Sequence, residues 1–253
     1  MRPGARRLVY ISENDPLPFA LLALTAVTGI VDAVSFLGLG HVFTANMTGN
    51  VVLLGFAVAG APGLSMARSS TSLVAFLIGA ALGGRLAVTM AAAGRRRWLR
   101  TVAVSEALLL VSAAIASIGF DIASATPPSR LYAVIVLTAL AMGLRNATVR
   151  RLAVPDLTTT VVLTQTLTGV AADSSVAGGD NPRLGRRIAS VALMFAGAAI
   201  GALLVRRGLA LPLIVGVVGV LVATVAYADV PTPPPAPASE SPAGSGRTPT
   251  KVG

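Results

Sequence analysis

Cysteine is absent from the 253 residues, histidine occurs once, and charged residues make up only 12% of the chain. Without cysteine the chain can form neither disulfides nor thiolate metal sites, and its redox compartment cannot be inferred. His41 alone cannot build a histidine metal site, so we expect no metal and no cofactor. A soluble domain carries roughly 25% charged residues. The low charge, together with 54% hydrophobic residues, therefore indicates a protein whose solvent is lipid.

The hydrophobic residues are arranged in blocks of about 20, the length that a helix needs to cross the hydrocarbon core of a bilayer. Six blocks are clear, and they cover residues 17–39, 70–93, 101–120, 131–149, 188–205 and 209–228. Two further stretches, 42–60 and 157–176, are also apolar but contain many polar residues. The predicted fold class is all-α, a polytopic bundle of transmembrane helices.

The two ends of the chain differ from this transmembrane domain, which we place at residues 17–228. Residues 1–16 form a basic N-terminal segment, and the block after it is long and contains Asp32. We therefore expect a retained first span and not a cleaved signal peptide. Residues 229–253 are rich in Pro, Ala and Ser without apolar periodicity, which is typical of a disordered tail.

The distribution of Lys and Arg residues between the two sides of the membrane distinguishes an arrangement of eight spans from one of six. If both polar stretches crossed the membrane, the Lys and Arg residues other than Arg85 would divide ten against nine between the two sides. If those stretches instead return on the side they entered, six spans remain, both termini are cytoplasmic, and the division is fifteen against four. The positive-inside rule favours the second arrangement. We expect six spans plus two polar re-entrant or half-helix segments, while full crossing by 42–60 and 157–176 stays an open alternative.

Three pairs of matching segments occur in the same order in the two halves of the chain. Residues 29–33 resemble 143–147, residues 46–50 resemble 162–166, and residues 79–84 resemble 197–202. The matches predict two repeats, about 17–120 and 130–228, each with three spans and one polar segment. Three is an odd number, so the second repeat would be inverted, an arrangement typical of secondary transporters. Chance recurrence of Gly-Ala segments is the competing explanation.

Polar residues inside these hydrophobic stretches form the candidate site. Such groups cost several kcal/mol in hydrocarbon unless they have partners or water. We therefore expect them to converge on one solute or ion pathway near the pseudo-two-fold axis; they are Asp32, Asn46, Thr48, Gly49, Asn50, Asn146, Thr164, Gln165 and Thr166. The alternatives for Asp32 are a structural acid that hydrogen-bonds the adjacent polar stretch, or a snorkelling surface residue.

Three further charged residues lie within the blocks. Arg85 is expected near the midplane and stays charged, so it needs an acidic or carbonyl partner. Asp32 and Glu106 are the candidate acids, although Glu106 is also close enough to the basic cluster 95–100 to pair there. Arg145 lies near the inner end of its block, where we expect it to snorkel to the surface.

Small residues recur at a spacing that favours close contact between helices. Gly79 and Gly83 lie one turn apart, as do Gly197 and Gly201 in the second half. In membranes such pairs let two helix backbones approach each other. We interpret these glycines as packing surfaces and not as ligand sites.

Two runs resemble the signatures of a known family. The run 29–50, GIVDAVSFLGLGHVFTANMTGN, resembles the first signature of the YoaK-like family, bacterial integral membrane proteins of unassigned function. The run GLRNA at 143–147, followed by RRLAVPD at 150–156, resembles the second. The resemblance covers about residues 18–228 and implies a multi-pass inner-membrane protein of about six spans, without naming a substrate. One departure is Gln165, where such proteins tend to have glycine, and it argues against a role that needs bare backbone there.

These patterns favour a small-solute or ion transporter, with a non-transporting membrane scaffold or assembly factor as the alternative. We expect no enzyme, because no nucleophile is accompanied by a base. Nucleic acid is not an expected partner despite the net charge of +10, since the arginines cluster at block ends and form no stripe on a soluble face. The expected partners are the lipid bilayer and an unknown solute; the oligomeric state, a homo-oligomer included, stays open.

Overall fold

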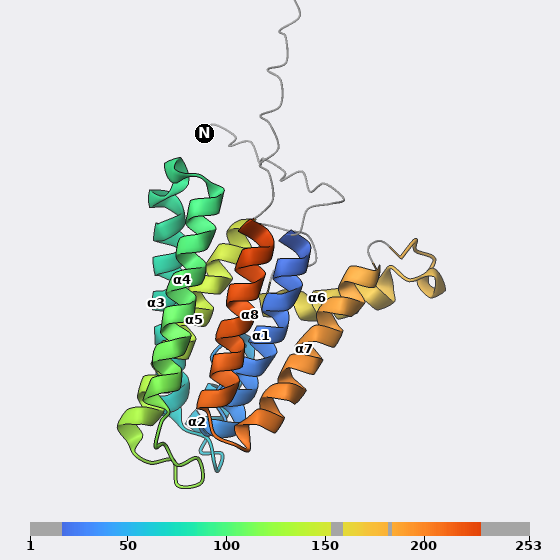
Figure 1. Ribbon diagram of the computed structural model, residues 1–253. Helices are drawn as coiled ribbons and strands as arrows, with labels where there is room; N and C mark the ends of the chain where they lie inside the picture. Colours follow the sequence, from blue (N-terminus) through green and yellow to red (C-terminus); the bar gives the residue numbers. More distant parts are fainter. Residues whose placement is uncertain (1–16, 153–158, 182–183, 229–253) are drawn as a thin grey trace, which may run out of the picture.

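A computed structural model describes residues 17–152, 159–181 and 184–228, so both terminal segments lie outside the described ranges. Within these ranges the chain is all-helical, with no strand and one isolated bridge between Asp121 and Thr126 (Figure 1). The α-helices are α1 (Leu17–Gly38), α2 (Met47–Val58), α3 (Met66–Thr89), α4 (Arg95–Ala116), α5 (Pro128–Leu152), α6 (Thr159–Ala172), α7 (Leu184–Val205) and α8 (Ala210–Ala228).

Five of the described helices are long and hydrophobic enough to cross a membrane, namely α1, α3, α4, α5 and α7. Helix α8, with 19 residues, is shorter and lies alongside α1 in the bundle. Helices α2 and α6 have 12 and 14 residues. At 1.5 Å per residue they reach only about 18 and 21 Å, less than the ~30 Å of a hydrocarbon core. These two helices lie in the stretches 42–60 and 157–176.

The outer surface of the bundle is hydrophobic. Phe195 of α7 is 75% exposed, and Leu77 of α3, Leu108 of α4 and Val225 of α8 are each more than 60% exposed. Soluble monomers rarely expose apolar patches of this extent. The exposed side chains therefore fit a protein surrounded by lipid.

The two ends of the bundle differ in charge. The start of α1, the turn between α3 and α4, and the end of α5 lie at one end of the bundle (Figure 1). We call it the arginine-rich end, because it carries Arg95, Arg96, Arg97, Arg100, Arg150 and Arg151. The opposite end holds α2 and the connection from α4 to α5, with Arg68, Arg130, Arg206 and Arg207 as its arginines.

Glycines bring α3 against α5. A Cβ atom built on Gly79 of α3 would collide with the carbonyl oxygen of Leu140 on α5, and one on Gly83 would meet the Leu144 oxygen at 2.9 Å. In return, a Cβ on Gly143 of α5 would collide with the carbonyl oxygen of Phe76. The two backbones therefore touch, which only glycine permits at these points.

Helices α7 and α1 make the same contact at a constant sequence offset. Gly197 of α7 lies against the Ala26 carbonyl of α1, and Gly201 lies against Ile30. A Cβ on Gly29 of α1 would collide with the Met194 carbonyl of α7. Gly197 and Gly201 occupy the same places in the α7–α1 contact as Gly79 and Gly83, the residues that they match in sequence, occupy in the α3–α5 contact.

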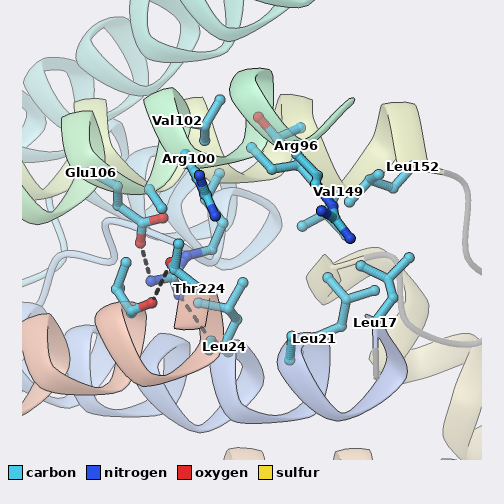
Figure 2. A pocket seen from close by; sticks show the side chains of 17 residues that line it. Leu17, Leu21, Leu24, Arg96, Arg100, Val102, Glu106, Val149, Leu152 and Thr224 are labelled. Carbon is cyan, nitrogen blue, oxygen red and sulfur yellow. Dashed lines mark hydrogen bonds and ion pairs between the residues drawn. The ribbon is translucent and has the colours of Figure 1, made fainter. Parts of the chain in front are cut away.

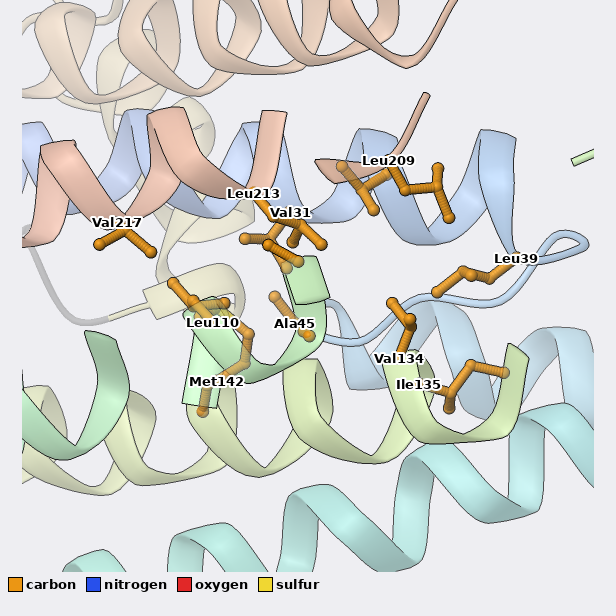
Figure 3. Close-up of a cluster of buried hydrophobic side chains, with 14 of the residues drawn as sticks. Val31, Leu39, Ala45, Leu110, Val134, Ile135, Met142, Leu209, Leu213 and Val217 are labelled. Atoms are coloured by element: carbon orange, nitrogen blue, oxygen red, sulfur yellow. The ribbon is translucent and has the colours of Figure 1, made fainter. Parts of the chain in front are cut away.

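A hydrophobic core joins these two pairs. Helix α4 packs on α5 and α8, and α8 packs on α1. Figure 3 shows the core between them, where Val31 of α1, Leu110 of α4, Ile135 of α5 and Leu213 of α8 are buried. Helices α1, α4, α5 and α8 therefore form the centre of the bundle, and α3 and α7 flank it.

The glycine contacts predict a clear difference between two substitutions in one helix. Gly79→Ala should lower the free energy of unfolding by about 1–3 kcal/mol, because its methyl group must displace the α5 backbone. Gly84→Ala is the matched control, since nothing lies within 4 Å of a Cβ at that position. Thermal unfolding of the purified protein in detergent measures both. Equal melting temperatures for the two variants would show that the α3–α5 contact is looser than described.

Candidate functional site

Asp32 holds the segment that leads into α2. Its carboxylate is buried and accepts a hydrogen bond from the backbone amide of Ala45 at 3.0 Å, with the amides of Thr44 and Asn46 also bonding it. Asn46 in turn caps α2, because its side-chain oxygen accepts from the Gly49 amide at 3.3 Å. Such caps satisfy the free amides at a helix start. The carboxylate therefore bonds the adjacent polar stretch, as a structural acid would.

Asn50 and Ser72 complete this arrangement. The Asn50 side chain accepts from the Phe43 amide at 3.3 Å and donates to the Ser69 carbonyl at 3.3 Å. The Ser72 hydroxyl donates to the Phe43 carbonyl at 2.6 Å. We call Asp32, Asn46, Asn50 and Ser72 the α2 lock, since together they fix α2 to α1 and α3. The remaining predicted residue of this stretch, Thr48, is exposed.

The second half has no matching lock within the described residues. Asn146 donates to the Met142 carbonyl of its own helix at 3.0 Å. On α6, Thr164 and Gln165 are exposed, whereas Thr166 is buried and its hydroxyl has no hydrogen-bond partner there. Arg187 of α7 instead bonds α6, donating to the carbonyl of Gly169 at 2.8 Å.

The structure does not bring the two polar sets into one region. The α2 lock lies toward the opposite end of the bundle, and α6 lies nearer the arginine-rich end (Figure 1). The physical reason is that each set finds partners close by: Asp32 binds backbone amides and Asn146 binds its own helix. Asp32 and Asn146 therefore do not need each other to meet their hydrogen-bonding capacity.

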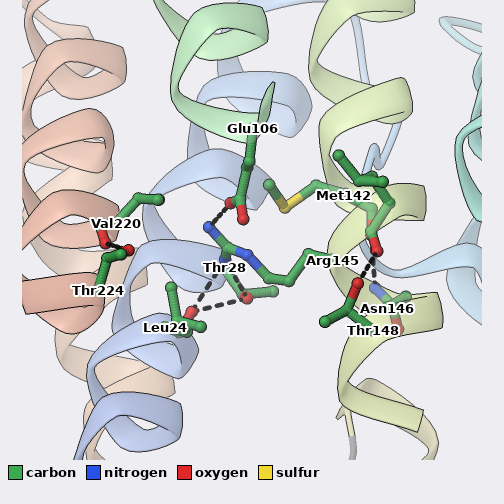
Figure 4. A network of polar contacts seen from close by, with 10 residues as sticks. Leu24, Thr28, Glu106, Met142, Arg145, Asn146, Thr148, Val220 and Thr224 are labelled. Atoms are coloured by element: carbon green, nitrogen blue, oxygen red, sulfur yellow. Dashed lines mark hydrogen bonds and ion pairs between the residues drawn. The ribbon is translucent and has the colours of Figure 1, made fainter. Parts of the chain in front are cut away.

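A buried ion pair lies between α4 and α5 instead. Arg145 is 3% exposed and donates to the carboxylate of Glu106, which is 2% exposed. Its other terminal nitrogen donates to the Leu24 carbonyl and to the Thr28 hydroxyl of α1, each at 3.0 Å (Figure 4). The pair thus connects three helices. The expectation that Arg145 snorkels to the surface was wrong.

Arg85 does not take the place predicted for it. It is exposed on α3, and no ion pair within the described ranges joins it to Asp32 or Glu106. Asp32 is bonded by backbone amides and Glu106 by Arg145. Helix α3 ends at Thr89, one turn after Arg85, so the guanidinium can reach the arginine-rich end along its own stem.

The helix bounds explain why the sequence missed the ion pair. Helix α4 begins at Arg95 and not at residue 101, so Glu106 lies about three turns inside it. Helix α5 continues to Leu152, which places Arg145 about two turns from its end. A usable signal was present, because a lone acid and a lone arginine inside neighbouring hydrophobic blocks each need a partner.

A cavity of about 70 Å³ reaches this ion pair between α1, α4, α5 and α8 (Figure 2). Glu106, Arg145, Thr148 and Thr224 contribute polar groups, and Arg96 and Arg100 line it where α4 begins. The rest of its wall is apolar and includes Leu17, Leu21, Leu24, Val102, Val149, Leu152, Val220 and Ala223. Three arginines against one acid give the cavity an excess of positive charge.

The groups in this cavity limit its chemistry. Among the residues that the structure describes, no cluster of His, Asp and Glu side chains could hold a metal ion. A buried arginine with a buried carboxylate can bind charge and exchange a proton, and apolar walls can exclude water. This cavity is therefore the candidate site, and it replaces the polar region predicted from the sequence.

Comparisons with known proteins agree with the resemblance seen in the sequence. The family described as "Protein of unknown function (DUF1275)" matches residues 20–226, which include the ion pair and the α2 lock. The UPF0700 transmembrane protein YoaK of Bacillus subtilis (strain 168) is 35% identical over 159 residues. That alignment covers 62% of this chain and 65% of the relative, slightly under two thirds of its length. No solved structure matches the chain.

The α2 lock predicts the effect of removing its carboxylate. Asp32→Ala should lower the free energy of unfolding by about 2 kcal/mol or more, because buried backbone amides lose their acceptor. Thr48→Ala, an exposed polar residue of the same stretch, is the control and should change little. Both are measured by thermal unfolding in detergent. If Asp32→Ala is as stable as the control, the carboxylate does not hold the segment.

Proposed function

The chain belongs to the DUF1275 family of multi-pass membrane proteins of unknown function, and we propose that it is a small-solute permease of the bacterial cytoplasmic membrane. In this proposal the substrate site is the cavity at Arg145 and Glu106. The supporting observation is the cavity itself, which reaches a buried ion pair from the arginine-rich end of the bundle. A charged, partly hollow site inside a helix bundle is unusual unless it binds something, since intramembrane charge is costly.

The position of the cavity agrees with an inverted repeat. By the sequence matches α1 corresponds to α5, and by their position as the last span of each predicted repeat α4 corresponds to α8; all four helices line the cavity. Helix α3 packs on α5 as α7 packs on α1, and α4 packs on α5 as α8 packs on α1. Helices α1 and α5 run in opposite directions through the bundle (Figure 1). Transporters with inverted repeats bind their substrates at such a repeat interface.

We further propose six spans, with α8 as the sixth, and with the arginine-rich end in the cytoplasm. The start of α1 and the end of α8 lie at this end. It also carries six described arginines against four at the opposite end, and the positive-inside rule assigns the side with more arginines to the cytoplasm. Helices α2 and α6 then enter from opposite sides without crossing.

A non-transporting scaffold is the second candidate, and the α2 lock is the observation that favours it. Asp32 accepts hydrogen bonds from backbone amides, and the side chains of Asn46 and Asn50 also bond within the protein, so among the described residues the Thr44 hydroxyl is the buried polar group near α2 that has no partner. In a scaffold the cavity would be a packing defect and the ion pair a structural tie. The two functions therefore differ in what happens when the cavity is filled.

Filling the cavity should stop flux if the cavity is the route. Ala223 of α8 lines the cavity and is buried, whereas its neighbour Val222 is exposed on the outer surface. We expect Ala223→Leu to reduce solute flux strongly and Val222→Leu to leave it unchanged. Swelling of proteoliposomes in a panel of small neutral solutes and salts measures the flux. Unchanged flux in Ala223→Leu, or no flux above protein-free vesicles in the native protein, would favour the scaffold.

The proposed topology can be tested by labelling single introduced cysteines, because the chain itself contains no cysteine that would react. Pro62→Cys and Ala123→Cys, both exposed at the opposite end, should react with an impermeant thiol reagent in intact cells. Arg97→Cys, exposed at the arginine-rich end, should react only after permeabilisation. Reaction of positions 62 and 123 from different sides would show that the six-span arrangement is wrong.

A further inference from the structure

The guanidinium of Arg145 has the properties of a buried anion site. Arginine stays protonated in proteins, so its charge persists in the core of the bundle. Both terminal nitrogens have partners, but the Nε atom is buried without a hydrogen-bond partner among the described residues. Arg145 also lines the cavity. A permanent cation that lines a cavity and keeps one donor unpaired suits a negatively charged ligand.

Glu106 is the one acid that lines this cavity. On α1, the Thr28 hydroxyl and the Leu24 carbonyl bond the guanidinium of Arg145. On α8, Thr224 lines the cavity. None of these groups is charged. Two arginines of α4, the helix of Glu106, lie nearer the start of that helix: Arg96 is half-buried and Arg100 is exposed. Glu106 therefore supplies the negative charge that now balances Arg145.

Charge balance dictates what must accompany an incoming anion. Arg145 and Glu106 together are neutral, so an added anion would leave a net negative charge in a low-dielectric core, at a cost of several kcal/mol. If a proton binds the Glu106 carboxylate, its bond to the guanidinium weakens and the anion can take its place. The site then holds one cation, one anion and a neutral acid, and it stays neutral.

The cavity also limits the size of the anion. Its volume of about 70 Å³ is half that of a 150 Å³ cavity that accommodates benzene. Only ions of a few atoms fit, such as nitrate, a halide or a short carboxylate. Arg96 and Arg100 at the arginine-rich end would raise the local concentration of such ions.

We propose that this cavity binds a small monovalent anion at Arg145 and that Glu106 takes up a proton with it, so that anion and proton cross together. On one side the proton adds to a Glu106 oxygen, the Glu106–Arg145 bond breaks, and the anion binds the guanidinium. On the other side the anion and the proton leave, and the ion pair re-forms. This inference rests on the proposed permease function and names its substrate class and coupling.

Nitrate is the probe for the test, because it stays ionised at all working pH values and does not cross lipid as a neutral acid. Native protein is reconstituted into liposomes that contain a pH dye, with valinomycin and potassium holding the membrane potential at zero. An inward nitrate gradient should acidify the lumen, with about one proton entering per nitrate by the charge balance above. An inward pH gradient alone should likewise drive nitrate uptake.

Glu106→Gln should abolish the nitrate-driven acidification to the level of protein-free liposomes, because the amide accepts no proton. Asp121→Asn is the matched control in the loop after α4. The Ser124 hydroxyl donates to Asp121 at 2.6 Å and lowers the pKa of its carboxyl, so this acid stays ionised during the assay. The control should keep native coupling. Because Glu106→Gln could fail to fold, the coupling ratio of the native protein decides the question by itself.

The outcomes separate this inference from the proposed function. Nitrate flux without proton movement, or flux of other solutes but not of nitrate, overturns the inference and leaves a permease. No flux of nitrate or of any solute in the swelling panel overturns both. Coupled movement that persists unchanged in Glu106→Gln shows that the proton is carried elsewhere and also overturns the inference.

Discussion

The ion pair between Arg145 and Glu106 sets the constraint on which the centre of this bundle depends. Neither charge can face hydrocarbon alone, so α5 and α4 must lie side by side at this depth. The same guanidinium bonds Leu24 and Thr28, which fixes α1 against them. Removing one member of such a pair typically costs more than the pair itself contributes, since the other charge is left buried. Loss of either charge should therefore loosen the contact among α1, α4 and α5.

Glycine contacts provide the second constraint, and they act between the centre and its flanks. Gly79 and Gly143 bring the backbones of α3 and α5 together, and Gly197 and Gly29 do so for α7 and α1. In lipid, where hydrophobic burial does not drive helices together, such close contact supplies the dispersion energy. The flanking helices can therefore stay in place with one narrow face against the bundle, and α7 exposes large residues such as Phe195 to lipid.

Much of this arrangement could be predicted from the sequence, and the reasons for the rest are local. The length of the hydrophobic blocks predicted the all-helical fold class. The polar residues of 42–60 and 157–176 distinguished the two short helices from the long ones. Block ends were less reliable, because amphipathic and basic turns such as 95–100 continue a helix beyond its hydrophobic stretch. That error placed Arg145 at the surface and left Arg85 and the basic cluster 95–100 as the expected partners of Glu106. Hydrogen bonds to backbone amides, such as those of Asp32, leave no periodic pattern, so the α2 lock stood only as an alternative.

A permease requires that the cavity at the ion pair belong to a route across the membrane. Ala103 of α4 lines this cavity and, in a chain without cysteine, Ala103→Cys gives a single reactive group. The measurement is the reaction of this cysteine with Ag⁺, a thiol-reactive ion of a single atom that does not cross lipid and fits a cavity of this size, added in turn to each face of oriented membrane vesicles. A permease that alternates its access predicts reaction from both faces. Reaction from the arginine-rich face alone, or from neither face, would contradict the account.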